Sequence, residues 1–286
     1  MHNATMPPGH GVETPAQIVE QLAAGWSLEV QPPFPLTPGS QGNFVAPATR
    51  ADGTPVVLKV SSRPAALRTE VEALRIWSGV GAARLLEWEP VLGALLLERV
   101  EPGTMLARVA DDDACVRVAA GVLRQLWRPL PSQHALRPLE SWCAAYDRHR
   151  DALSRGDGGF PRALFQRADA LRRELLASTQ APVVLHGDLH HFNVLRSTRA
   201  DWLAIDPKGL VGDRYFDLCQ FLLNPVAVPA TVNRRRLDLF CAELGLDRER
   251  ASHWCLVHAV LDACWEYEEG RAWQASVAYA EEAATF

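Results

Sequence analysis

Lysine is nearly absent from this chain of 286 residues. Only Lys59 and Lys208 occur among 29 basic residues, and all the others are arginines. Where arginine replaces lysine this widely, a surviving lysine indicates a position that needs a compact ammonium group rather than a planar guanidinium. The net charge of −5 also argues against a general nucleic-acid binder, which would carry a strongly basic surface. We therefore interpret the basic triplet 234–236 as the solvated face of a helix.

Paired cysteines and long apolar runs are missing as well. The six cysteines are scattered without a C-x-x-C pair, which argues against a zinc site or a disulfide framework. They predict buried thiols in a reducing compartment. No stretch approaches the roughly eighteen apolar residues of a membrane span, and residues 1–15 lack the apolar core of a secretory signal. We expect a cytoplasmic protein that does not enter a membrane.

The first hundred residues predict a small β-rich lobe. Thr14-Pro15-Ala16-Gln17 has the form of a capping box with proline at the first helical position, so a helix should run from there to about residue 26. Asp52-Gly53 predicts a tight hairpin. The pattern indicates strands at 27–32, 43–50, 55–60, 84–89 and 94–100, with a helix at 67–78.

The pattern changes to helices after Pro102-Gly103. Helices are predicted at 112–127, 139–155, 161–178, 214–223, 232–244, 248–269 and 272–283, interrupted by a loop and short strands at 182–206. The acids 111–113 suit the N-terminus of the first of these helices. The predicted fold is α+β with two lobes, an N-terminal lobe at 1–100 and a helical C-terminal lobe at 101–286. We expect a cleft near 97–103.

The most informative motif is His186-Gly187-Asp188-Leu189-His190-His191-Phe192-Asn193, followed by Ile205-Asp206 after a short apolar run. It fills every fixed position of the kinase catalytic loop H-x-D-L-x-x-x-N. In that pattern Asp188 faces the acceptor hydroxyl, whereas Asn193 and Asp206 hold magnesium. Magnesium prefers oxygen ligands and keeps several waters, so one amide and one carboxylate suffice beside the phosphates.

Two other interpretations of this segment are possible. A polar hairpin with chance spacing is one, but four fixed residues and flanking strands disfavour it. A zinc hydrolase using His186, His190 and His191 is the other. Zinc-binding helices have the pattern H-E-x-x-H, whereas Gly187-Asp188 indicates a loop.

The segment 185–195, followed by Ile205-Asp206-Pro207-Lys208-Gly209, resembles the aminoglycoside phosphotransferase family. It is most similar to the branch that contains streptomycin 6-phosphotransferases and hydroxyurea phosphotransferases. The resemblance extends from about residue 26 to the end of the chain. It implies a protein-kinase-like fold, ATP and Mg²⁺ as cofactors, and transfer of the γ-phosphate to a hydroxyl of a small molecule.

The resemblance also implies a nucleotide site. Lys59 would contact the α- and β-phosphates, with Glu70 as its helix partner and Glu72 as the alternative. The adenine would be read by backbone groups at Glu98 and Val100. A turn that covers the phosphates would consist of Ser40, Gln41 and Gly42, although a plain hairpin explains that turn equally well.

His186 and Asp217 are expected behind the catalytic residues, where Asp217 would brace the loop. Gly187 stands where regulated protein kinases carry arginine. Without that arginine we expect no coupling to a phosphorylated activation loop, and therefore a constitutively assembled small-molecule kinase.

The acceptor is less well indicated. Asp262 and Glu266 fall on one face of a predicted helix and would suit a cationic acceptor, although an ordinary solvated face is an equal alternative. Lys208 would reach a phosphate or substrate oxygen, or would be a solvated turn lysine. A streptomycin-like acceptor is the first hypothesis, and hydroxyurea or another small hydroxyl compound the second. A nucleotide-binding scaffold without catalysis is the third. The choice of ATP over GTP stays open, and the protein is expected to be a monomer or a weak dimer.

Overall fold

The computed structural model describes residues 14–35, 43–155, 161–224 and 228–286. Contacts divide the chain into two compact units. The first unit comprises Met1–Ala65 and Leu86–Arg99, and the second comprises Ala66–Leu85 and Val100–Phe286. No helix within the described residues is long and apolar enough to cross a bilayer.

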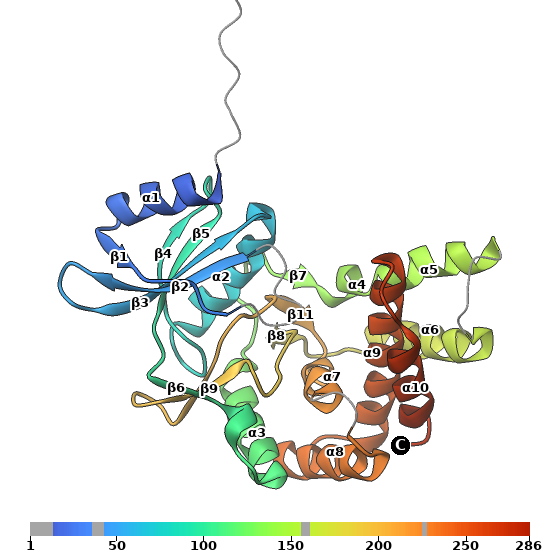
Figure 1. Cartoon of the computed structure of the whole chain (residues 1–286). Helices are drawn as coiled ribbons and strands as arrows, with labels where there is room; N and C mark the ends of the chain where they lie inside the picture. The colour runs from blue at the N-terminus through green and yellow to red at the C-terminus, as the bar shows by residue number, and fades with distance from the viewer. Residues whose placement is uncertain (1–13, 36–42, 156–160, 225–227) are drawn as a thin grey trace, which may run out of the picture. The chain divides into compact units, whose positions relative to one another are not determined.

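The first unit is a five-stranded sheet covered by one helix (Figure 1). Helix α1 (Pro15–Gly25) begins with the predicted capping box, in which the Thr14 hydroxyl accepts from Gln17 N–H and the Gln17 side chain accepts from Thr14 N–H. The strand order is β1-β2-β3-β5-β4. The strands are β1 (Leu28–Val30), β2 (Asn43–Arg50), β3 (Pro55–Ser61), β4 (Leu85–Glu89) and β5 (Ala94–Glu98).

The middle strand β3 explains where Lys59 points. Leu58 and Val60 are buried in one apolar cluster with Leu22 of α1. Because successive side chains of a strand point to opposite faces, Lys59 lies on the face of the sheet away from α1. In the ladder, Lys59 stands opposite Val45 of β2 and Leu95 of β5.

The second unit contains two small three-stranded sheets with strand orders β10-β9-β6 and β7-β11-β8. Their strands are β6 (Pro102–Met105), β7 (Arg137–Pro138), β8 (Val183–Leu185), β9 (Val194–Ser197), β10 (Trp202–Ala204) and β11 (Leu210–Gly212). Strands β8 and β9 flank the segment 186–193, and β10 and β11 flank the segment 205–209. Two sheets thus hold the ends of both parts of the motif.

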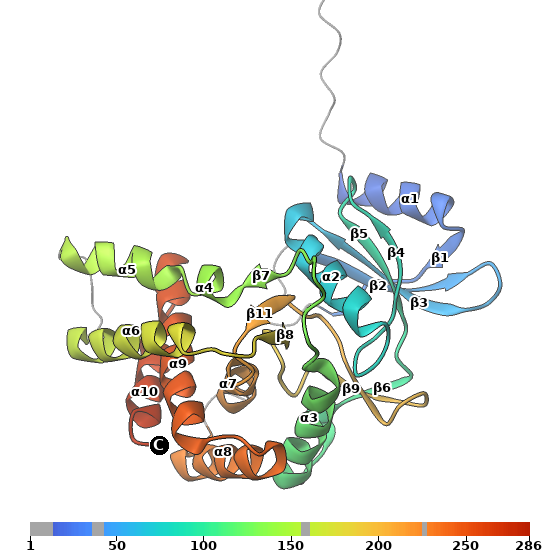
Figure 2. The same cartoon turned by 180° about the vertical axis from the view of Figure 1, so that it is seen from behind.

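Helices make up the rest of this unit (Figure 2). They are α2 (Leu67–Trp77), α3 (Asp112–Leu126), α4 (Leu139–Trp142), α5 (Ala145–Ser154), α6 (Arg162–Ala177), α7 (Phe216–Leu223), α8 (Ala230–Leu244), α9 (Arg248–Glu268) and α10 (Gln274–Ala283). Helix α9 is buried on nearly all sides and contacts α5, α6, α7, α8 and α10. All six cysteines are buried and unpaired, as predicted.

Two details of the sequence interpretation were wrong. The helix predicted at 139–155 is broken between α4 and α5, at Cys143 and Ala144. The triplet 234–236 is not a uniformly solvated face. Arg236 is buried, and its guanidinium donates to both carboxylate oxygens of Asp112 at 3.0 Å and to Asn224 O at 2.9 Å. A buried guanidinium needs such a charged partner, so this arginine joins α8 to α3.

Candidate active site

A buried carboxylate holds the start of the segment 186–193, which we call the catalytic loop. Asp217, on α7, accepts from His186 N–H at 3.1 Å and Gly187 N–H at 2.8 Å. Its third donor is the Trp127 indole N–H, at 3.1 Å. Burial raises the pKa of Asp217 to about 6, although these donors lower it. Asp217 therefore joins α7 to the first two backbone N–H groups of the catalytic loop.

His186 connects the catalytic loop to the segment after β10. Its Nδ1 accepts from Asp188 N–H at 3.2 Å, so the proton of the neutral ring lies on Nε2 and is donated to Ile205 O, 3.0 Å away. The ring is fully buried, with the Trp77 ring stacked beside it at 6.2 Å between centroids. Burial lowers the pKa of His186 to about 4, which keeps the ring neutral.

The two predicted metal ligands are joined through the backbone. Ile205 N–H donates to Asn193 O at 2.9 Å, which brings Asp206 next to the end of the catalytic loop. The side-chain Nδ2 of Asn193 donates to Asp188 O at 3.0 Å. Asp206 has φ +58°, a left-handed conformation that costs free energy for a residue with a side chain. Such strain is typical of residues held in place for function.

Lys208 lies between the two carboxylates. Its Nζ is 2.9 Å from Asp188 Oδ2 and 3.4 Å from Asp206 Oδ2. Desolvation opposes its charge, but Asp206 and Asp188 outweigh this effect and raise the pKa of Lys208 above its usual value. The structure thus brings Asp188, Asn193, Asp206 and Lys208 together. Because its ammonium contacts two carboxylates, Lys208 is not simply a solvated lysine in a turn.

Two glycines allow this close arrangement. A Cβ on Gly187, where φ is +79°, would lie 2.8 Å from Leu210 Cδ1. A Cβ on Gly209, where φ is +65°, would lie 1.9 Å from Thr69 O. Real Cβ contacts are not this short, so both positions require glycine for space as well as for backbone conformation.

Two further loop residues, His190 and Phe192, lie at this site, although the kinase loop pattern gives them no role. The Nε2 of His190 is 3.7 Å from Asp188 Oδ1 and 3.2 Å from Asn193 Nδ2, and its Nδ1 accepts from Phe192 N–H at 3.2 Å. Phe192 packs against the His190 ring edge to face and is 42% exposed. Both occupy variable positions of the loop pattern, which is why the motif alone does not indicate them.

The predicted nucleotide-binding residues fall in both units. Lys59 and Glu98 belong to the first unit, and Glu70 and Val100 to the second. Lys59 and Glu70 are buried, whereas Glu72 is only partly buried. Their joint contact with a nucleotide stays a prediction, and the turn 40–42 lies outside the described residues.

The acids predicted to bind the acceptor lie along α9. Asp262 Oδ2 is 3.5 Å from Nδ1 of the buried His258, and the Asp262 side chain is 20% exposed. Glu266 accepts from the Ser276 hydroxyl at 2.7 Å and is 3.9 Å from an Arg271 nitrogen. Partial burial raises the pKa of Glu266. The two acids are thus not an evenly solvated face.

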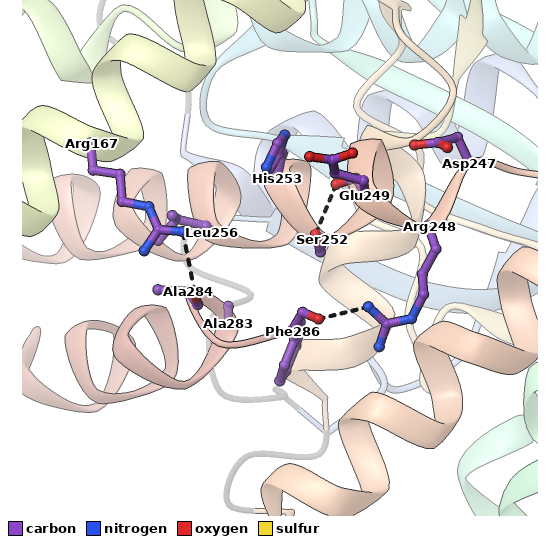
Figure 3. A pocket seen from close by; sticks show the side chains of 10 residues that line it. All are labelled: Arg167, Asp247, Arg248, Glu249, Ser252, His253, Leu256, Ala283, Ala284 and Phe286. Atoms are coloured by element: carbon purple, nitrogen blue, oxygen red, sulfur yellow. Dashed lines mark hydrogen bonds between the residues drawn. The ribbon is translucent and has the colours of Figure 1, made fainter.

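A hollow of about 510 Å³ occurs elsewhere in this unit, at the start of α9 and the C-terminal end of α10 (Figure 3). Its arginines are engaged with backbone carbonyls, Arg248 with Phe286 O and Arg167 with Ala284 O. It contains none of the residues of the catalytic loop. We therefore place the candidate active site at the loop and not at this hollow.

Known proteins resemble this chain along most of its length. The family described as aminoglycoside/hydroxyurea antibiotic resistance kinase matches residues 28–270. A streptomycin 6-kinase of Streptomyces glaucescens is 36% identical over 271 residues, with 89% of this chain and 84% of the relative covered. A hydroxyurea phosphotransferase of Kitasatospora aureofaciens is 37% identical over 268 residues, with 90% and 74% covered.

Solved structures confirm the predicted fold class. An aminoglycoside phosphotransferase in ternary complex with ADP and hygromycin B matches with a TM-score of 0.66 and 14% identity, over 93% of this chain and 96% of that one. A choline kinase from Streptococcus pneumoniae matches with a TM-score of 0.63 and 14% identity, over 94% and 98%. Because the family model and these relatives match most of its length, the chain belongs to the aminoglycoside/hydroxyurea antibiotic resistance kinase family.

Proposed function

We propose that this protein transfers the γ-phosphate of ATP to a hydroxyl of a streptomycin-like aminoglycoside and thereby confers antibiotic resistance. The observation that carries the proposal is the grouping of Asp188, Asn193, Asp206 and Lys208 at the braced catalytic loop. Its two parts come from separate stretches of the chain and meet through backbone hydrogen bonds. Membership of the kinase family gives the reaction class.

Asp188 is the proposed catalytic residue. Its backbone is fixed by the His186 ring, and its carboxylate is 20% exposed, so it can meet a hydroxyl. The acceptor oxygen forms a bond to the γ-phosphorus while the bond from phosphorus to the bridging oxygen of ADP breaks. The hydroxyl proton passes to Asp188 Oδ. Positioning and charge neutralisation supply most of the rate enhancement in such a transfer.

The residues present fit a magnesium ion. The Asn193 amide donates through Nδ2 to Asp188 O, which leaves its Oδ1 as a ligand beside the carboxylate of Asp206. Mg²⁺ commonly binds through one or two protein groups, waters and phosphate oxygens, so one amide oxygen and one carboxylate are sufficient protein ligands. When bound, the ion would neutralise charge on the phosphates.

Lys59 and Glu70 are proposed as the ion pair that positions the α- and β-phosphates, with Glu98 and Val100 at the adenine. Lys59 is held in the middle strand of the first sheet, which gives its long side chain a rigid base. These roles rest on the family resemblance and on the burial of Lys59 and Glu70.

A coupled ADP-release assay over a panel of acceptors tests the proposal. We expect turnover with streptomycin, dependence on Mg²⁺, and a fall of about 10²–10⁴ in kcat for Asp188→Ala with nucleotide binding retained. Turnover of Asp188→Ala within about tenfold of the wild type would contradict the role of this residue. Tight ATP binding without turnover of any acceptor would favour a scaffold instead.

Hydroxyurea is the second candidate acceptor, because a hydroxyurea phosphotransferase is as similar to this chain as the streptomycin kinases are. Charge distinguishes the two acceptors, since streptomycin carries guanidinium groups and hydroxyurea is neutral. We propose that Asp262 and Glu266 attract a cationic acceptor. Asp262→Asn with Glu266→Gln should raise the KM for streptomycin at least tenfold, whereas the exposed Glu281→Gln serves as a control. An unchanged KM would exclude both acids.

A further inference from the structure

Lys208 has a fixed backbone and a side chain that points at two acids. Its N–H donates to His186 O at 2.8 Å, and its carbonyl accepts from the Thr69 hydroxyl at 2.7 Å. The next residue, Gly209, lies against the backbone of Thr69. The side chain is 36% exposed, and its ammonium contacts Asp188 and Asp206. The backbone of Lys208 is therefore anchored on both sides, whereas its partly exposed side chain can exchange partners.

The Lys208 ammonium contacts Asp206, the carboxylate to which the metal ion of a bound nucleotide would bind. Asp206 is a proposed metal ligand, and Asp188 is the proposed partner of the acceptor hydroxyl. One ammonium touches both carboxylates, so it neutralises part of their mutual repulsion in the nucleotide-free protein. Glu70 is a further acid whose charge acts on Lys208. An arriving cation must therefore compete with Lys208 for Asp206.

Lysine suits such an exchange better than arginine. Its ammonium is a compact point charge on a flexible stem, whereas guanidinium binds carboxylates as a rigid planar fork. This chain uses arginine for almost every other positive charge. The retention of lysine at this position therefore fits a charge that has to move between partners.

We propose that Lys208 is a resident counter-cation that also acts in catalysis. Without nucleotide its ammonium occupies Asp206 and suppresses the binding of free metal. With the metal nucleotide bound, the ammonium leaves Asp206, stays beside Asp188 and contacts the transferring phosphoryl group, keeping its own proton throughout. The second step rests on the proposed phosphoryl transfer, but the first does not.

The first step is tested by titrating Mg²⁺ or Mn²⁺ alone against the nucleotide-free protein, with melting temperature and calorimetry as readouts. We expect Lys208→Met to bind the metal at least tenfold more tightly than the wild type, and Lys208→Met with Asp206→Asn to lose that gain. Lys208→Arg keeps the charge and should bind metal as weakly as the wild type. Arg248→Met, which removes an exposed cation paired with Asp238, should change nothing.

The second step is tested by steady-state kinetics on the acceptor that the wild type phosphorylates. Loss of one preorganised charge contact to the transferring group should lower kcat about 10²–10³-fold, with the KM for ATP changed less than about threefold. Partial recovery of kcat in Lys208→Arg would support an electrostatic role. If a folded Lys208→Met variant binds metal no more tightly than the wild type, the proposal that Lys208 is a counter-cation at Asp206 is wrong. If the kcat of this variant stays within about threefold of the wild type, the proposed catalytic role of Lys208 is wrong. The metal titration needs no acceptor, so it gives its answer even if the proposed function is wrong.

Discussion

Gly187 offers the sharpest test of how the catalytic loop is held. Its φ is +79°, and a Cβ would lie 2.8 Å from Leu210 Cδ1 and 2.9 Å from Leu210 Cγ. A left-handed alanine costs about 1–2 kcal/mol. Forcing a methyl group against a fully buried leucine adds about 1–3 kcal/mol. Gly187→Ala should therefore lower the free energy of unfolding by about 2–5 kcal/mol.

Gly245→Ala is a matched control, because Gly245 has φ +64° and a Cβ there would meet nothing within 4 Å. It carries the backbone strain without the contact. Urea unfolding of both variants separates the two costs, and the difference should be about 1–3 kcal/mol. Adding Leu210→Ala should relieve the clash, so the double variant is less destabilised than the two single variants together.

Activity should fall with the same change. Gly187 N–H donates to Asp217, and Asp188 follows directly in the chain. A shift of the loop by about 1 Å costs about 10² in rate, so we expect a kcat lower by about that factor. If Gly187→Ala were no less stable than Gly245→Ala and kept its kcat, the close approach of Gly187 to Leu210 would not explain the glycine.

Two more predictions concern the buried groups of the loop. Burial lowers the pKa of His186 to about 4, so the folded state favours the neutral ring. The unfolded state binds a proton at this histidine below its pKa of about 6.5, whereas the folded state does so only near pH 4. The free energy of unfolding should therefore be highest above pH 6.5 and fall by about 2 kcal/mol between pH 7 and pH 5. Urea unfolding at both pH values should show a loss about 2 kcal/mol larger in the wild type than in His186→Asn, because other buried histidines such as His191 remain in both proteins, and equal losses would refute it. Asp217→Asn replaces an acceptor of three hydrogen bonds by an amide with one acceptor atom, so kcat should fall about 10²-fold with a nearly unchanged KM. Since burial raises the pKa of Asp217 to about 6, the wild-type kcat should approach that of the variant below pH 6, and steady-state rates from pH 5 to 8 check this.

The sequence predicted the elements that depend on local signals. The capping box at Thr14 and the apolar strand at 55–60 were recovered because both are encoded by neighbouring residues. Asp111 likewise caps α3, its side chain accepting from Ala114 N–H. The loop pattern correctly brought Asn193 and Asp206 together, because its spacing reflects one fixed backbone arrangement.

The parts that sequence could not give depend on distant contacts. Strands β6 and β7 have only four and two residues, too few for a periodic pattern, and they form by pairing with β9 and β11. The burial of Arg236 depends on Asp112, far away in the chain. Lys208 lies between two acids in a segment where Asp206 has a left-handed backbone. An aspartate in the sequence does not by itself reveal that its backbone is left-handed.

The contact between Gly209 and Thr69 has a consequence for control of the protein. Protein kinases are commonly switched by displacing the helix that carries the glutamate of the lysine–glutamate pair. In this chain the first turn of α2, the helix that carries Glu70, packs against the segment that follows Asp206: Gly209 lies against the Thr69 backbone, and the Thr69 hydroxyl donates to the Lys208 carbonyl. Swinging α2 outward would tear this junction apart and expose its polar groups. An outward movement of α2 would therefore cost this chain the Thr69–Lys208 hydrogen bond and the packing at Gly209.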